Sequence, residues 1–130
     1  MGVFFHWQEA VAWHPGQRTA RFFISQVRAL EEALEVQSGF GEIIADEVVL
    51  NPSLIRVFVS ALVEVLDSIT SNSFKTMVAG PFAIAYGILV ACEPDLSLPM
   101  SDATGRLARR GEVLVSGRRR VEPIYEGLGD

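Results

Sequence analysis

Two histidines and one nearby acid are the first candidates for metal chemistry. His6, Glu9 and His14 lie close together near the N-terminus. Zinc needs three or four converging nitrogen, sulfur or oxygen ligands, and the spacing of these residues matches none of the usual zinc motifs. We therefore expect no metal site and no cofactor here. His6 is expected at the edge of a strand, and His14 at the chain break before Pro15.

The single cysteine and three acids are the candidates for catalysis. A reactive thiolate needs a helix N-terminus or a nearby cation, whereas Cys92 is expected at the C-terminal end of an apolar helix, beside Glu93. A buried structural thiol is the preferred interpretation. Glu42, Asp46 and Glu47 could form an acid pair for general catalysis, but no second cluster accompanies them. The sequence therefore indicates no catalytic residue and leans against an enzyme.

Arginine is concentrated near the C-terminus. The concentrated set is Arg106, Arg109, Arg110, Arg118, Arg119 and Arg120. No aromatic residue lies among them to stack on bases, and the formal net charge of −5 opposes nonspecific nucleic-acid binding. Pairing with Glu31, Glu35 or Glu64 inside the chain, or docking to an acidic partner protein, is a better account of this basic patch.

The composition fits one compact domain over residues 1–130, with a frayed tail at 126–130. Hydrophobic residues make up 49% and charged residues 21% of the chain, as in globular proteins. A lone cysteine excludes an internal disulfide, and no secretory leader is visible, so we expect a cytoplasmic protein. The longest uncharged stretch, Thr76–Cys92, is 17 residues and falls short of the ~20 residues that span a membrane.

Apolar spacing predicts three main helices, at about 19–37, 52–71 and 74–92. In the first helix an apolar stripe faces the core and acids face water, with Arg28 able to pair with Glu32. The second helix starts at Asn51-Pro52, a capping side chain followed by proline. The apolar stripe of the first helix is Ala20, Phe23, Val27, Leu30 and Leu34.

The second and third helices carry unusually little polarity. The polar positions of the second helix fall in one narrow stripe, so this helix is either central in the monomer or offers part of its face to an oligomer or a ligand, and we predict a homodimer. In the third helix, small residues every four positions would let another helix approach closely, and Gly80-Pro81 should kink or divide it. The polar stripe is Ser53, Arg56, Ser60, Glu64, Asp67 and Ser71, and the small residues are Ala79, Ala83, Gly87 and Ala91.

A small antiparallel β element completes an α+β, predominantly helical fold. Val3–Trp7 alternates like a strand, and residues 9–13 are expected to turn into a short helical segment. The latter half of residues 42–50 is expected to be extended. Ser101 should cap a helical turn that ends at Gly111.

The last predicted element is a C-terminal hairpin. Glu112–Val115 and Arg118–Val121 flank Ser116-Gly117, a connection of the two-residue type. Because side chains alternate along a strand, Arg118 and Arg120 would share one exposed face.

Short motifs in the first 70 residues or so resemble a small actinobacterial family of uncharacterised proteins. The chain has His14 where that family often has a polar residue such as asparagine. The family has no assigned activity, so the resemblance implies no function. The motifs are Phe4-Phe5, Trp13-His14-Pro15, Arg21-Phe22, Gln26-Val27, Glu31, Ser38-Gly39, Asp46-Glu47, Pro52 and Phe58.

Two classes of function remain open. The first is a non-enzymatic protein-interaction module, such as an immunity protein, an antitoxin-like partner or a regulator, in which carboxylates meet a basic partner. The second is a small-ligand-binding or enzymatic domain with an apolar pocket between the second and third helices. The first predicts a surface of Glu31, Glu32, Glu35, Glu42, Asp46 and Glu47, and the second a pocket with Arg56, Gly80, Pro81 and Tyr86.

Overall fold

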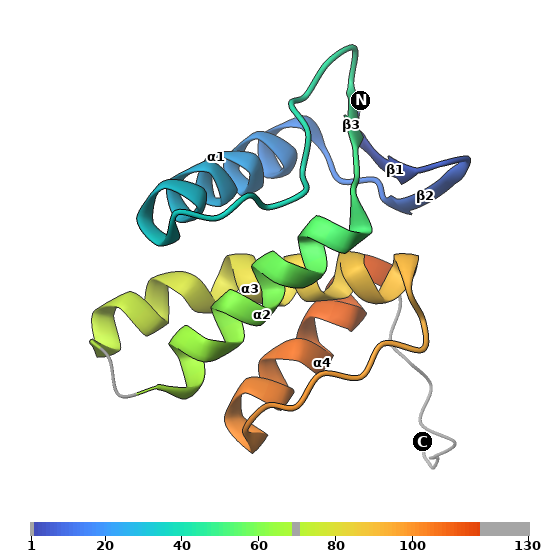
Figure 1. Ribbon diagram of the computed structural model, residues 1–130. Coiled ribbons are helices and arrows are strands. Elements are labelled where there is room, and N and C mark those ends of the chain that lie inside the picture. The colour runs from blue at the N-terminus through green and yellow to red at the C-terminus, as the bar shows by residue number, and fades with distance from the viewer. Residues whose placement is uncertain (1, 69–70, 118–130) are drawn as a thin grey trace.

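Four helices and a three-stranded sheet make up the fold in a computed structural model, which describes residues 2–68 and 71–117. The sheet lies beside one end of the helices, and α1 crosses above α2 and α3 (Figure 1). The elements are β1 Phe4–Trp7, β2 Ala10–Trp13, α1 Gln17–Leu34, β3 Glu47–Val49, α2 Pro52–Asp67, α3 Asn72–Cys92 and α4 Asp102–Ser116. The α+β class and the predominance of helix are confirmed.

The sheet has the order β2-β1-β3. β1 pairs antiparallel with β2, with Phe5 opposite Trp13, and parallel with β3, with Phe5 opposite Val48. These three side chains are buried. His6, expected at a strand edge, lies instead on the central strand. Residues 10–13, expected to be helical, form β2, because this short segment can pair with β1 through a tight turn at Gln8 (φ 56°).

α1 uses the predicted apolar stripe: Ala20, Phe23, Val27 and Leu30 are buried. It ends at Leu34, earlier than predicted, because Glu35 adopts a left-handed conformation (φ 54°) and its N–H bonds to the carbonyl oxygen of Glu31. The pair predicted between Arg28 and Glu32 is made one position earlier, with Nη1 of Arg28 lying 3.1 Å from Oε2 of Glu31.

α2 begins as predicted, with the Asn51 side chain accepting a hydrogen bond from Leu54 N at 3.2 Å. Most of its polar stripe is exposed, and the only exposed large apolar side chain of this helix is Val57. The rest of its apolar circumference is buried or partly buried within one copy of the chain. The apolar circumference of α2 therefore gives no reason to expect a dimer.

α3 remains one helix through Pro81 and is not divided. The predicted small residues do allow close approach, but the partner is α4, although α2 also packs on α3. A Cβ placed on Gly87 would lie 2.7 Å from Cγ2 of Val115, and one on Gly111 would lie 2.9 Å from Cα of Ala83. The backbones of α3 and α4 therefore touch directly at this crossing.

The predicted C-terminal hairpin is wrong in its described part. Residues 112–116 are the last turns of α4, and Gly117 (φ 74°) ends the helix in the left-handed conformation that suits glycine. Ser101 caps this helix as predicted, but the helix continues past Gly111. Arg118–Val121 and the tail predicted at 126–130 lie outside the described residues.

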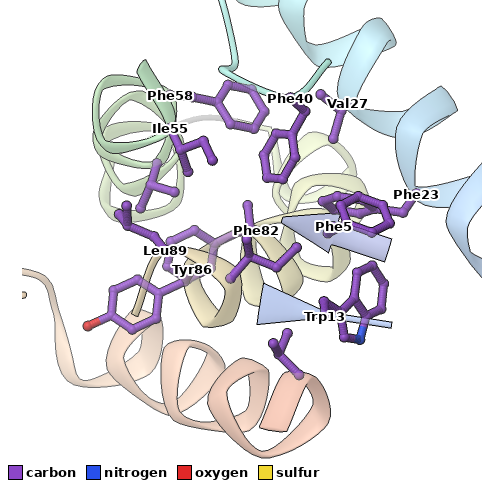
Figure 2. Packing of buried hydrophobic residues seen from close by; sticks show 14 of the residues in the cluster. Phe5, Trp13, Phe23, Val27, Phe40, Ile55, Phe58, Phe82, Tyr86 and Leu89 are labelled. Atoms are coloured by element: carbon purple, nitrogen blue, oxygen red, sulfur yellow. The ribbon is translucent and has the colours of Figure 1, made fainter. Parts of the chain in front are cut away.

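The core joins the sheet to the helices through aromatic rings. Phe5 packs on Trp13 and Phe23, with ring centroids 5.0 and 6.0 Å apart, and Phe23 continues to Phe40 at 5.2 Å. Phe40 reaches Phe58 on α2 (Figure 2). Each such ring contributes about 1.5–3 kcal/mol by leaving water. The sheet is thereby held rigidly against the helices.

Within the described residues, α3 is the one helix long and apolar enough to cross a membrane. Half of the tested window is buried inside the fold, and core helices of many folds pass the same test by length and composition. The finding is therefore weak evidence for a membrane span.

Candidate functional site

A strained turn displays an apolar side chain among acids. Ile44 and Glu47 exchange both backbone hydrogen bonds, at 2.9 and 3.0 Å. The two residues between them have positive φ, 52° at Ala45 and 62° at Asp46, as in the two-residue turns that normally carry asparagine and glycine. Ile44 is 66% exposed. The turn presents Ile44 to solvent, with Glu42 and Asp46 exposed beside it.

The turn is held in place from both sides. Nε2 of Gln17 on α1 donates to Oδ1 of Asp46 at 2.7 Å, and Phe4 N donates to the carbonyl oxygen of Asp46 at 2.9 Å. Gly41 N donates to the carbonyl oxygen of Val49, so the segment before the turn runs antiparallel to β3. We call Glu42, Ile44 and Asp46 the turn surface.

The outer face of the sheet is also solvent-exposed. Side chains alternate along strands, so Phe4, His6, Glu47 and Val49 oppose the buried set, and a register shift between β1 and β2 pairs Val11 with His6 and so brings it to the same face. Val11 is 53% and Val49 62% exposed. We call this set, with Glu9, the sheet face. Most of its members line a shallow hollow of about 180 Å³, whose wall is Phe4, His6, Gln8, Glu9, Val11 and Glu47.

The two histidines that were weighed as metal ligands make separate contacts. The His6 Nε2 atom lies 3.0 Å from Oε1 of Glu47, but no hydrogen-bond geometry is met, so the contact is only electrostatic and depends on protonation of His6. The His14 ring stacks on Phe4, with centroids 3.9 Å apart. Among the described residues, no group of three or more histidines, cysteines or acids could hold a metal ion.

The acids predicted on α1 fall into two kinds. Glu31 is committed to the fold, because it pairs with Arg28 and accepts hydrogen bonds from the backbone and hydroxyl of Ser38. Arg28 also donates to the carbonyl oxygens of residues 40 and 41, at 2.8 Å each. This network fastens the segment after α1 to the helix. Glu32 and Glu35 are exposed.

The residues predicted to form a ligand pocket are not brought together. Arg56 forms an ion pair with Glu93, and Gly80 is exposed. Tyr86 instead lines a hollow of about 400 Å³ against α4, with Arg106 and Arg109 on its wall. Burial, and then the nearby carboxylate of Glu112, raise the pKa of Tyr86.

A larger cleft, of about 710 Å³, lies beside Trp7 and the start of α2. Both carboxylates on its wall, Glu31 and Glu93, already have arginine partners. A ligand in this cleft would therefore have to break an existing ion pair in order to bind either carboxylate.

Cys92 has the properties of a structural thiol. It is partly buried, and burial, followed by the charge of Glu93, raises its pKa to about 11. The nucleophilic thiolate is therefore scarce at neutral pH. The geometry agrees with the interpretation from sequence.

Asp67 forms a polar junction between α2 and α4. Its carboxylate accepts hydrogen bonds from the backbone and hydroxyl of Ser101, at 3.0 and 2.7 Å, and from the hydroxyl of Thr104 at 2.5 Å. The bond from Thr104 and those from Ser101 hold the pKa of Asp67 below its usual value. The cap of α4 is thereby tied to the end of α2.

Sequence reasoning listed the acids of the turn surface but missed Ile44, and it missed the sheet face altogether. Ile44 lies in the first half of residues 42–50, for which no conformation was predicted, and no local signal marks it as exposed. For the sheet face, the alternation of Val3–Trp7 already assigned Phe4 and His6 to one side.

Residues 1–116 match a family model described as "Family of unknown function (DUF6086)". This match confirms the resemblance to an uncharacterised family, and it reaches beyond the first 70 residues to include α3 and α4. No curated protein and no solved structure matches the chain.

Proposed function

This chain belongs to the DUF6086 family, whose function is unknown, and from its geometry we propose that it is a non-enzymatic protein-binding module that uses the turn surface. The observation that carries this proposal is Ile44, a β-branched apolar side chain that is 66% exposed at a turn between acids. In Figure 1 the segment that leads into β3 rises away from the helices. Such a position suits contact with another macromolecule.

The conformation of the turn supports the proposal. A left-handed conformation costs an ordinary residue such as Ala45 roughly 1–2 kcal/mol. Strain of this kind persists where the surroundings enforce it, and it concentrates at functional positions. Here the bonds from Gln17 and Phe4 to Asp46 hold the strained turn. The turn surface is therefore presented in one fixed shape, which lowers the ordering cost of binding.

The chemistry of the turn surface suggests the kind of partner. An apolar anchor that enters a pocket and a polar rim around it are the usual anatomy of a protein interface. Glu42 and Asp46, two positions before and after Ile44, are both exposed and could supply an acidic rim. We therefore propose a partner protein with an apolar pocket bordered by lysine or arginine, in keeping with an immunity or antitoxin-like role.

The test replaces Ile44 and compares it with a matched control. Phe22 on α1 is also 66% exposed, so Phe22→Asp introduces the same charge at an equally exposed apolar site. Partners captured from native lysate on the wild-type chain are identified, purified and titrated by calorimetry. We expect Ile44→Asp to weaken binding by about thirtyfold, the ~2 kcal/mol of an interface hot spot, while Phe22→Asp leaves the affinity unchanged.

Charge reversal separates the two acidic surfaces predicted from sequence. We expect Glu42→Lys to slow association and to weaken its salt dependence. Glu32→Lys with Glu35→Lys tests the α1 face, and a larger effect there would move the site to α1. A purified partner whose affinity is unchanged by both Ile44→Asp and Glu42→Lys would overturn the proposal.

A further inference from the structure

We propose that a second copy of this chain binds the sheet face, with arginines of α4 from each copy placed in the hollow of the other. This proposal goes beyond the turn surface and does not depend on it, because it uses different residues. It rests on two oppositely charged, partly apolar surfaces that one molecule carries together.

The sheet face has the chemistry of a guanidinium site. Glu9 and Glu47 line the hollow of about 180 Å³, together with the ring of Phe4. A guanidinium group binds carboxylates through its forked N–H donors and also stacks on aromatic rings. Among the described residues, the only cation within 4 Å of Glu47 is His6, and only when it is protonated. Within the described part of the chain, the wall of the hollow therefore carries no permanent positive charge.

Charge is segregated between the layers of the molecule. Residues 2–16 and 39–50, which hold the three strands and the turn, include four acids and neither lysine nor arginine. The acids are Glu9, Glu42, Asp46 and Glu47. A face with this charge attracts a basic surface and repels an acidic one, so it selects its partner by sign.

α4 presents the complementary surface. Arg106, Arg110 and Val113 recur at spacings of four and three, so they share one face of the helix, and all three are exposed. Leu114 is exposed beside them. Among the described residues, neither arginine has an ion pair within 4 Å. Arg106 also lines the hollow beside Tyr86, together with Glu112, whereas Arg110 is not part of its wall.

The two surfaces adjoin on each copy, which favours a reciprocal arrangement. A groove of about 600 Å³ lies between β2 and the last turn of α4, with Val11 and Leu114 on its wall. A two-fold axis near this groove would place each helix on the opposite sheet face, so that both charge contacts form at once. Val11 and Val49 of one copy would then meet Val113 and Leu114 of the other, and apolar area would be buried on both sides.

The experiment exchanges charge between the two surfaces. Variant one is Glu9→Arg with Glu47→Arg, and variant two is Arg106→Glu with Arg110→Glu. The mass of each is measured by sedimentation at low salt, at concentrations up to hundreds of micromolar, after circular dichroism has verified the fold. A matched control reverses two exposed arginines of α1, Arg18→Glu with Arg21→Glu.

The expected result is a wild-type dimer of twice 14.3 kDa that weakens at least severalfold as salt rises. Each variant alone should be monomeric, because like charges then face each other, and the equimolar mixture of the two should recover the dimer. The α1 control should dimerise like the wild type. Milder replacements, Glu→Gln and Arg→Gln at the same positions, serve if a reversed variant fails to fold, and each should weaken the dimer.

A monomeric wild type under these conditions would overturn the proposal, and so would a dimer that neither variant alters. If the variants dissociate but their mixture does not pair, the contact between sheet face and α4 is wrong. Ile44→Asp provides the separation from the proposed function. It should leave the dimer intact, so that loss of partner binding and loss of self-association are read independently.

Discussion

Gly111 on α4 provides the most direct test of how the helices are packed. A side chain at this position would overlap the carbonyl group of Ala83 on α3, and its Cβ would lie 2.9 Å from Cα of the same residue. These obstacles are backbone atoms, which cannot turn aside as a flexible side chain can. Gly111→Ala must therefore push α3 and α4 apart.

The size of the effect follows from two opposing contributions. Alanine in place of glycine inside a helix gains ~1 kcal/mol of helix stability. Forcing a methyl group into a packed interface costs ~1–3 kcal/mol, and an obstacle made of backbone places Gly111 at the upper end. The net expectation is a loss of about 2 kcal/mol in the free energy of unfolding, which lowers Tm by roughly 4–16 °C.

Gly105 on the same helix is the matched control. A Cβ there would meet only Nη1 of Arg109, at 3.6 Å, an ordinary contact. Gly105→Ala should therefore raise stability by ~0.5–1 kcal/mol, so the two glycine variants should differ by about 3 kcal/mol in urea unfolding followed by circular dichroism. If Gly111→Ala is as stable as Gly105→Ala, the close crossing of α3 and α4 is refuted.

Two further predictions concern protonation. Because the pKa of Cys92 is about 11 against an ordinary 9.0, its thiolate at pH 8 should be scarcer by about a hundredfold than in the unfolded chain. A disulfide reagent should therefore react far more slowly with native than with urea-unfolded protein, and equal rates would contradict this. Since folding lowers the pKa of Asp67 below 3.8, the stability it provides is fully present above that value and is lost as pH falls through the lower folded pKa. The difference in unfolding free energy between wild type and Asp67→Asn should accordingly shrink below pH 4, and a difference that grows there would contradict the assignment.

Local signals predicted the helices well where they agreed with tertiary packing. Asn51 and Pro52 fixed the start of α2, because a capping side chain and a proline act within one turn. The stripe from Ala20 to Leu30 identified the buried face of α1 for the same reason. The small residues of α3 predicted a close helix neighbour, although not that α4 supplies it.

The prediction of a C-terminal hairpin was wrong because a local turn signal competed with a helical pattern. Ser116-Gly117 resembles a two-residue hairpin connection, but in the structure Gly117 ends a helix. Thr104, Ala108, Gly111 and Val115 are spaced by four, three and four, and all are buried. That spacing is helical. Its small residues, Ala108 and Gly111, are of the same kind as the small residues of α3. The two sets of small residues, taken together, predict a helix over residues 104–115 that packs on α3.

The candidate site was predicted in part, for a different reason. Charge alone is enough to list Glu42 and Asp46 as surface acids, since neither has a cationic neighbour in sequence. The exposure of Ile44 depends on a turn whose residues do not favour it, so no local propensity announces it. The gathering of Glu9 with Glu47 depends on the pairing of β1 with both neighbouring strands.

The parallel pairing of β1 with β3 has a consequence for how the chain folds. Phe5 lies opposite Val48, which is 43 positions later in the sequence, so this ladder cannot close until β3 and everything before it have been synthesised. Closing so long a segment is entropically slow compared with forming a helix or the β1–β2 hairpin. A ribosome-bound chain should therefore hold α1 and the hairpin early and leave the backbone N–H of Phe4, which donates to Asp46 in the folded chain, unprotected until about residue 50 emerges, and arrest at successive lengths with hydrogen exchange would locate that step.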